Sequence, residues 1–208
     1  MDDNNQKLLA ILRDIYAVSA ELGLKSYVWG GFAADILHGA FTREHRDLDC
    51  FTENLTDHID TLKTRYEALG YTVNYLENFW MLQIYKDGVH AAFNCVKNIG
   101  GIAHWYHAGR HGTVFFPFDW LDKEPLVFYG ARVYTIGVPL LYILKTNVRL
   151  LHAEWQTRDK DLADIALLEP LLASQKINIA DFRKKVWSHN PIWYANGYEE
   201  YYYPITLK

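Results

Sequence analysis

Two aspartates separated by one residue, Asp47 and Asp49, are the side chains of this sequence best suited to chemistry. They begin the run 47–51, whose polar–apolar alternation predicts a strand, so both carboxylates are expected on one face. Two carboxylates side by side repel each other unless a cation lies between them. Mg²⁺ prefers such oxygen ligands and completes its coordination with phosphate oxygens and water. The pair predicts a magnesium site, and a solvated pair at a strand edge is the alternative.

Two adjacent glycines, Gly30 and Gly31, precede the aspartates. They follow the apolar run 27–29, which predicts a strand, and they lead into a predicted helix over 32–38. Glycine lets a ligand approach the backbone closely, and the free N–H groups and positive dipole end of a helix N-terminus favour an anion. The arrangement suits a phosphate group, although two glycines here also fit an ordinary strand–helix turn.

Three basic side chains, Arg43, His45 and Arg46, lie just before the aspartates. The planar guanidinium of arginine makes two parallel hydrogen bonds to a phosphate. These residues could therefore hold a triphosphate or offset the carboxylates. Salt bridges to Glu44 or Asp47 would instead give them a local structural role.

Composition and charge limit the partners of the chain. Half of the 208 residues are apolar, which is enough for a folded core, and no apolar run approaches the roughly 20 residues of a membrane span. The net charge of −4 disfavours long nucleic acids but allows a nucleotide in a local positive pocket. The two cysteines, Cys50 and Cys95, do not make a disulfide framework and are expected to be buried thiols. We expect a cytoplasmic protein.

Periodicity and turn residues predict the elements that position these groups. The first part of the chain mixes helices over 5–22, 32–38 and 56–69 with strands over 27–29, 47–51, 71–76, 79–85 and 89–96 and a hairpin over 126–136. Residues 97–113, rich in Gly and His, predict a loop. The second part predicts helices over 140–155, 159–173 and 179–188 and an irregular tail from Pro191. This pattern is typical of an α+β domain, residues 1–136, followed by a C-terminal helical cap, residues 137–208.

The ordered combination of strand, glycine pair, short helix, basic loop and aspartate strand resembles a known signature. The run from Trp29 to Asp49, WGGFAADILHGAFTREHRDLD, resembles that of the small antibiotic nucleotidyltransferases, the aminoglycoside and lincosamide adenylyltransferases of the polymerase-beta-like superfamily. The helix holding Lys145 and the run from Arg158 to Asp164 are similar to later parts of that family. The resemblance implies the nucleotidyltransferase fold, a mixed sheet with flanking helices, followed by a C-terminal helical region.

The resemblance also implies a reaction. Such enzymes bind a nucleoside triphosphate such as ATP with Mg²⁺, transfer the nucleoside monophosphate to a hydroxyl of a small molecule and release pyrophosphate. Asp47 and Asp49 would hold the metal and carry catalysis. Gly30, Gly31, Arg43, His45 and Arg46 would bind the nucleotide phosphates, and Lys145 could reach the triphosphate, although a surface lysine is the alternative.

The sequence departs from the family at one place. The family usually has a third acidic residue on a neighbouring strand, where it completes the metal site or acts as a general base. The matching stretch, residues 88–94, contains no carboxylate, and Ala91 or Ala92 takes the acidic position, depending on register. His90 and Asn94 share a face there and could contribute as accessory groups.

This departure leaves several functions open. The chain could be an active transferase with an altered site, a nucleotide-binding or regulatory protein of the same fold without turnover, or the nucleotidyltransferase of a toxin–antitoxin pair. The acceptor is also open, because a polycationic aminoglycoside would need an acidic pocket and a lincosamide an apolar one. The aromatic residues late in the chain could line the acceptor site, form a homodimer contact or simply pack in the core.

Overall fold

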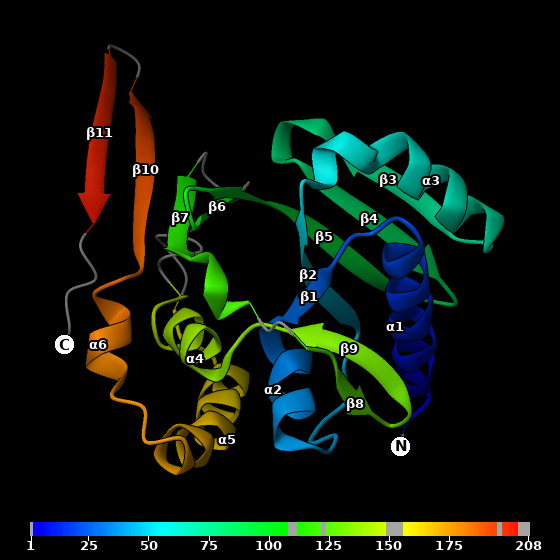
Figure 1. The fold of residues 1–208 in the computed structure, drawn as a ribbon, viewed down its shortest axis with the longest axis horizontal. Helices are drawn as coiled ribbons and strands as arrows, with labels where there is room; N and C mark the ends of the chain where they lie inside the picture. Colours follow the sequence, from blue (N-terminus) through cyan, green and yellow to red (C-terminus); the bar gives the residue numbers. More distant parts are fainter. Residues whose placement is uncertain (1, 108–111, 122–123, 149–155, 195–196, 204–208) are drawn as a thin grey trace.

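The computed structural model describes residues 2–107, 112–121, 124–148, 156–194 and 197–203, with side chains described only up to Val186 and not at Tyr106, His107 or Gly112. Figure 1 shows the elements in chain order. The helices are α1 (Asp3–Glu21), α2 (Gly30–His38), η1 (Leu55–His58), α3 (Ile59–Ala68), η2 (Glu77–Phe79), η4 (Phe118–Trp120), α4 (Val138–Thr146), α5 (Asp159–Ser174) and α6 (Ile179–Arg183). The strands are β1 (Ser26–Trp29), β2 (Asp47–Glu53), β3 (Thr72–Leu76), β4 (Met81–Lys86), β5 (Val89–Ile99), β6 (Ile102–His107), β7 (Gly112–Pro117), β8 (Leu126–Phe128), β9 (Ala131–Thr135), β10 (Trp187–Tyr194) and β11 (Gly197–Tyr203).

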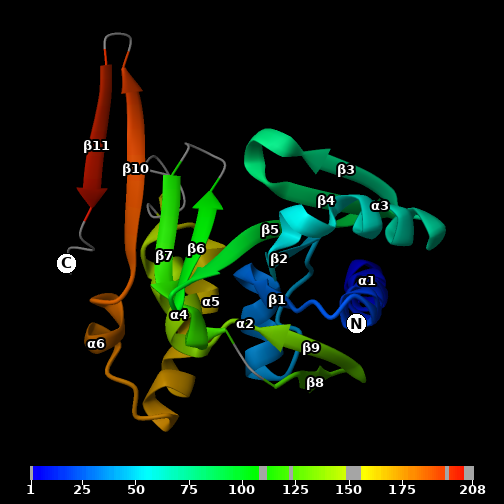
Figure 2. The same ribbon diagram turned by 45° about the horizontal axis from the view of Figure 1, so that its top comes forward.

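One mixed sheet joins these strands in the order β11-β10-β7-β6-β5-β2-β1-β9-β8 (Figure 2). The pairs β2–β5 and β1–β9 are parallel, whereas β1–β2 is antiparallel. The long strand β5 changes partners along its length, because its first half lies between β2 and β4 and its last residues pair with β6. The predicted mixed sheet with flanking helices is confirmed.

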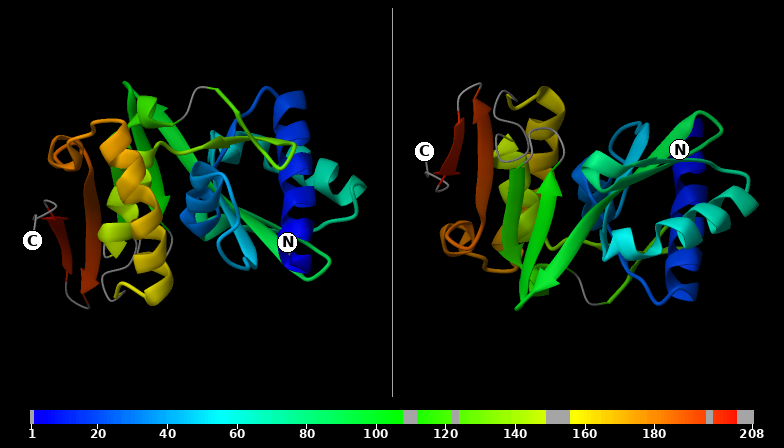
Figure 3. Two further views of the ribbon diagram at one scale, coloured as in Figure 1. Left: turned by 90° about the horizontal axis from the view of Figure 1, so that it is seen from below. Right: turned by 90° about the horizontal axis from the view of Figure 1, so that it is seen from above.

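The helices form two groups (Figures 1 and 3). α1 packs on β9, β5 and β1 and contacts α3, whereas α2, α4 and α5 pack on one another. The apolar stripe of α1 includes Leu8, Leu12 and Ile15, all almost fully buried in the core. Because α2 also contacts β1 and β2, the second group lies directly against the strand that precedes the glycines and the strand that carries the aspartates.

Two predictions about the middle and the end of the chain are wrong. Within the segment 97–113, the described residues 97–107 and 112–113 are mainly strand and not loop, because β5 continues to Ile99 and the antiparallel pair of β6 and β7 follows. In the tail from Pro191, the described residues 191–194 and 197–203 are not irregular, because β10 and β11 pair antiparallel and β10 extends the sheet from β7. The C-terminal region therefore contains α4, α5 and α6 but is not wholly helical.

The remaining elements agree with the sequence prediction to within a few residues at most ends. The predicted helix over 140–155 is described as α4 up to Thr146, and residues 149–155 lie outside the described part of the chain. The third helix of the cap, α6, ends at Arg183, earlier than predicted. Cys50 and Cys95 are free and buried, as expected. The described helices include none with the length and hydropathy of a membrane span. The domain boundary near residue 136 stays a prediction.

Candidate active site

The two aspartates lie at the start of β2, next to the end of β1 and the start of β5. Asp49 pairs with Trp29 of β1 and with Ala92 of β5, and Asp47 pairs with His90. Both carboxylates lie on the same face of the sheet because they alternate along the strand. Asp47 is exposed and Asp49 is partly buried. Burial, followed by the charge of Asp47, raises the pKa of Asp49 to about 7.

The raised pKa shows that the protein alone disfavours two negative charges at this place. A divalent cation would reverse that preference because it neutralises both carboxylates. Among the described residues, no cluster of three or more His, Cys, Asp or Glu side chains could hold a metal ion. Mg²⁺ is commonly held by one or two carboxylates together with phosphate oxygens of a substrate, and the Asp47–Asp49 pair fits that mode.

The glycine pair forms the first turn of α2, and neither position has room for a side chain. Gly30 has φ of +76°, and a Cβ there would lie 3.0 Å from Oδ2 of Asp49. A Cβ at Gly31 would collide with the Arg43 guanidinium and approach Oδ2 of Asp164 to 3.2 Å. The side chain of Trp29, the N-cap residue of α2, makes no capping hydrogen bond. The glycine pair lines the same cavity as the aspartates, and the N–H groups of this helix start could bind an anion there together with a cation on the carboxylates.

A buried carboxylate in α2 fixes the basic loop. Asp35 accepts hydrogen bonds from the backbone N and the hydroxyl of Thr42, at 3.0 and 2.6 Å, and from Nε2 of His45, at 2.7 Å. Burial alone would raise its pKa, but the hydrogen bonds from His45 and Thr42 leave the pKa of Asp35 below its ordinary value. Nδ1 of His45 lies 3.2 Å from Nη1 of Arg43, so the imidazole contacts both Asp35 and Arg43. His45 thus positions Arg43.

Asn5 of α1 holds the same loop from the other side. This fully buried side chain donates to the carbonyl of Arg43 at 2.9 Å and accepts from the backbone N of His45 at 3.0 Å. Sequence analysis missed Asn5 and gave Asp35 no role. A polar residue within the apolar stripe of α1 was the only available signal for Asn5.

Charged residues of α4 and α5 form a buried network beside the loop. The Lys145 ammonium lies 3.1 Å from Asp161 and 2.6 Å from Asp164. Arg158 makes two side-chain hydrogen bonds to Asp161, and Arg43 reaches Asp164 at 3.3 Å. Burial would raise the pKa of Asp161, but the hydrogen bond from Arg158 and the charge of Lys145 leave it well below its ordinary value. The network ties α5 to α4 and to the basic loop.

A cavity of about 310 Å³ collects most of the predicted site residues. The predicted site residues that line it are Gly30, Gly31, Arg43, His45, Asp47, Asp49, Asn94 and Lys145. Arg46 is exposed and does not line the cavity, and His90 does not line it either. His90 stacks on Tyr85, with 5.3 Å between the ring centroids. The cavity is also lined by Arg158, the N-cap residue of α5, and by Lys160 of α5, and the sequence predicted no ligand for either residue.

The register between β2 and β5 shows whether Ala91 or Ala92 lies at the position where the family usually has a third acidic residue. Ala92 pairs directly with Asp49 and so lies on the aspartate face, whereas Ala91 pairs with the buried Leu48. On the other side of Ala92, β4 presents Gln83. Asn94 lines the cavity, and its amide lies 3.4 Å from the carbonyl oxygen of Cys50. None of these neighbours is anionic.

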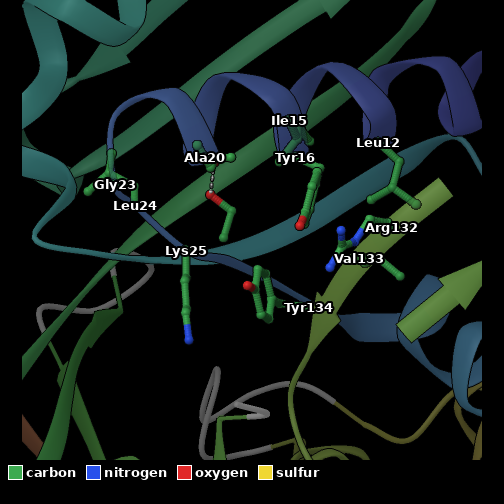
Figure 4. A pocket seen from close by; sticks show the side chains of 12 residues that line it. Leu12, Ile15, Tyr16, Ala20, Gly23, Leu24, Lys25, Arg132, Val133 and Tyr134 are labelled. Carbon is green, nitrogen blue, oxygen red and sulfur yellow. Dashed lines mark hydrogen bonds between the residues drawn. The ribbon is translucent and has the colours of Figure 1, made fainter. Parts of the chain in front are cut away.

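A second cavity, of about 200 Å³, lies between α1 and β9 (Figure 4). Tyr16 and Tyr134 stack there with ring centroids 6.0 Å apart, and Lys25 and Arg132 lie over their faces. The rings and the cations contact one another, which gives this cluster a packing role. None of the predicted site residues lines this cavity.

Comparison with solved structures gives the class of fold. The lincosamide antibiotic adenylyltransferase LnuA, solved with lincomycin bound, is 18% identical over 79% of this chain and 95% of its own, with a TM-score of 0.57. ANT(2'')-Ia, solved with adenylyl-2''-tobramycin, is 18% identical over 85% of this chain and 97% of its own, with a TM-score of 0.61. An antigenic nucleotidyltransferase-like protein from Paracoccidioides brasiliensis is 12% identical over 81% and 78%, with a TM-score of 0.54. The fold is that of the nucleotidyltransferases.

The sequence places the chain more narrowly within that class. Residues 11–134 match the model of the aminoglycoside-2''-adenylyltransferase family, and the chain belongs to this family. The match covers the second half of α1, the glycine pair, the basic loop and the aspartate strand. A search of curated proteins gives no match.

Proposed function

We propose that the chain transfers a nucleoside monophosphate from a magnesium-bound nucleoside triphosphate to a hydroxyl of a small molecule. The observation that carries the proposal is the shared cavity, in which the Asp47–Asp49 pair faces the uncapped N-terminus of α2 and the Arg43 guanidinium. Family membership supports the same reaction. Mg²⁺ bound by the two carboxylates would supply charge neutralisation on the phosphates.

The described residues would have different roles in such a transfer. The N–H groups at the start of α2 and the guanidinium of Arg43 would bind phosphate oxygens, because both are donors beside the carboxylate pair. His45, Asp35 and Asn5 would act as positioning residues that hold Arg43 and its loop. The Lys145 ammonium, which is paired with Asp161 and Asp164, would orient α5 and partly neutralise the negative charge of the phosphates. Catalysis would consist mainly of positioning and charge stabilisation.

Pyrophosphate release tests the proposal. The purified protein is incubated with each of the four common nucleoside triphosphates, Mg²⁺ and a panel of hydroxyl compounds, and pyrophosphate is measured. We expect release that requires Mg²⁺ and an acceptor and that falls at least about 100-fold in Asp47→Asn, since a metal-binding carboxylate is removed. Release that survives this substitution unchanged would contradict the proposed roles of the aspartates.

A nucleotide-binding protein without turnover is the second candidate, favoured by one observation. Ala92 occupies the position paired with Asp49, and neither Gln83, which pairs with Ala92 from β4, nor Asn94 has a carboxylate to accept the proton of an acceptor hydroxyl. Under this candidate, Mg²⁺ and nucleotide would bind at the same cavity without pyrophosphate release.

Restoring the carboxylate separates the two candidates. We predict that Ala92→Asp increases the stabilisation of the protein by Mg²⁺ and nucleotide and, if the wild type lacks turnover, produces pyrophosphate release. Ala92→Asn is the matched control because it has the same shape without the charge. Thermal unfolding with and without Mg²⁺ provides a readout that does not depend on activity. Equal behaviour of the Asp and Asn variants would show that the position beside Asp49 does not contact the metal or the acceptor.

A further inference from the structure

A third cavity, of about 580 Å³, lies away from the aspartate pair, at the opposite ends of α2 and α4. Gly30 and Lys145 of these helices line the cavity at the aspartates, whereas Leu37 and Val138 line the third cavity. The described linings of the two cavities have no residue in common. The volume is within the roughly 300–1,000 Å³ that is usual for small-molecule sites. A molecule in the third cavity would therefore occupy a separate place from the nucleotide.

Most of the described lining of the third cavity is apolar or aromatic. Trp120 of η4 packs on Phe182 of α6 with ring centroids 4.9 Å apart, and the Trp120 carbonyl accepts a hydrogen bond from the backbone N of Gly137 at 2.9 Å. These contacts fix one wall. Leu126 is 39% exposed, so an apolar molecule in the cavity would cover surface that otherwise contacts water. The apolar lining residues are Leu37, Trp120, Leu126, Val138, Pro139, Ile177 and Phe182.

The polar side chains of this lining favour a cation. They are the exposed carboxylates of Asp119 and Glu124 and the amide of Gln175. The described lining includes no Lys, Arg or His. Lys185 lies 6.0 Å from the centroid of the Phe182 ring but does not line the cavity. An ammonium group would therefore be attracted to the two carboxylates without displacing a cation of the described lining.

The helix ends at the third cavity add to this preference. α2 ends one residue beyond Leu37, and Gln175 is the C-cap residue of α5, so two helix C-termini with their negative dipole ends lie there. α4 begins at the same cavity with the opposite dipole, next to its N-cap residue Gly137. Pro139, in the first turn of α4, has no N–H to offer an anion. Two C-termini and two carboxylates thus oppose a single N-terminus.

We propose that the third cavity is a binding site for a small, largely apolar molecule that carries one amine cation. Its apolar part would contact Trp120 and Phe182, and its ammonium would lie at Asp119 and Glu124. The site goes beyond the proposed nucleotidyl transfer and does not depend on it, because no residue of the cavity at the aspartates takes part. An uncharged apolar molecule is the other occupant that the lining allows, and the test separates the two.

Two probes of nearly equal shape and different charge test the proposal. Phenylbutylamine carries an ammonium where phenylbutanol carries a hydroxyl, and each is titrated into the full chain up to about 10 mM while the indole N–H signals are followed by NMR. Trp120 reports on the third cavity and Trp29 on the cavity at the aspartates, and Trp120→Phe and Trp29→Phe assign their signals. We expect the amine to shift the Trp120 signal saturably, to leave the Trp29 signal in place and to bind at least about tenfold more tightly than the alcohol. A shift of the Trp29 signal alone would place the amine at the aspartate pair and overturn the proposal.

Paired substitutions test the role of the two carboxylates. Asp119→Asn with Glu124→Gln removes both charges and keeps the shapes of two exposed side chains. Asp60→Asn with Glu67→Gln, both exposed in α3, is the control with the same change in net charge. We expect the affinities for the two probes to differ by less than about threefold in the cavity pair, whereas the control pair keeps the preference for the amine. The proposal is overturned if neither probe shifts the Trp120 signal, if the wild type binds both probes equally, or if the cavity pair keeps the preference.

Discussion

Within one basic loop, three residues of similar type have three different environments. Arg43 lines the cavity and contacts Asp164, His45 is buried between Asp35 and Arg43, and Arg46 is exposed. The difference follows from their contacts with α1, α2 and α5, not from their own chemistry. Arg43 is therefore the member of the loop that we expect to contact phosphate, and His45 the member that positions it.

The lack of space at Gly31 leads to a prediction about Arg43. In Gly31→Ala the added methyl group would overlap the guanidinium and displace it from Asp164 and from the phosphate site. We predict that the affinity for the magnesium nucleotide, measured by calorimetry, falls roughly tenfold or more, because a charge-assisted contact is misplaced. Gly23→Ala is the control for backbone strain without a steric clash, since φ there is +67° but a Cβ meets nothing within 4 Å, and its nucleotide affinity should not change. Unchanged nucleotide affinity in Gly31→Ala would remove Arg43 from the phosphate site.

At the residue scale, the sequence predicted the candidates better than their partners. Gly30, Gly31, Asp47 and Asp49 were predictable because a short ordered segment brings them together through one strand, one turn and the next strand. Asn5 and Asp164 were not assigned a place beside Arg43, because their contacts with the loop cross 38 and 121 positions of the chain. Such long-range contacts leave no local pattern.

At the element scale, α5 is held to the site by charge. Asp161 lies in the first turn of α5 and is paired with Arg158 and Lys145 while almost fully buried. Removing one partner of a buried pair leaves charges uncompensated, which costs more than the pair itself contributes. The position of α5, and with it the arrangement of Arg158 and Lys160 at the cavity, depends on this carboxylate.

This dependence predicts a defined response to acid. Because the pKa of Asp161 is lowered on folding, its ionised form stabilises the protein above the unfolded pKa of about 4, and that contribution is lost as the pH falls further. We predict that Asp161→Asn lowers the free energy of unfolding at pH 7 by roughly 3 kcal/mol and that its difference from the wild type shrinks between pH 5 and pH 2.

Urea unfolding across this pH range provides the measurement. Asp159→Asn serves as the control, because Asp159 lies in the same turn of α5 but is exposed. We expect this variant to change the free energy of unfolding by less than about 1 kcal/mol, the size of a helix-terminus charge effect. A difference between Asp161→Asn and the wild type that is constant with pH would contradict the assigned role of the carboxylate.

The sequence did not predict β6, β7, β10 and β11, because local turn residues or missing periodicity hide them. Residues 97–113 contain glycines at 100, 101, 109 and 112, which locally favour turns, yet β5 and β6 pair through Val96 and Trp105. Trp105 is fully buried against Phe51, and this tertiary contact outweighs the local turn preference. The hairpin of β10 and β11 is likewise formed by pairing with β7, which no local periodicity in the tail indicates.

Across the whole molecule, the site is assembled from distant parts of the chain. The sheet supplies the aspartates and the apolar strands, α2 supplies an uncapped N-terminus, and α4 and α5 supply the opposite wall of the cavity. The fold class was predictable because the signature segment belongs to one fold. The apolar part of the cavity lining was not, because it combines residues of α4 with residues of β1 and β4 that lie far apart in the sequence.

The proposed nucleotidyl transfer depends most directly on metal-dependent nucleotide binding by Asp47 and Asp49. The decisive measurement is calorimetric titration of a non-hydrolysable ATP analogue into wild type and Asp49→Asn, each with Mg²⁺ and with EDTA, with the exposed Asp60→Asn as control. We predict binding that requires Mg²⁺ in wild type and control and that weakens at least tenfold in Asp49→Asn. The metal-free Asp49→Asn protein should be as stable as the wild type or more stable, because the repulsion from Asp47 is relieved. Nucleotide binding that is equally tight in Asp49→Asn, or that is unchanged by EDTA, would contradict the account.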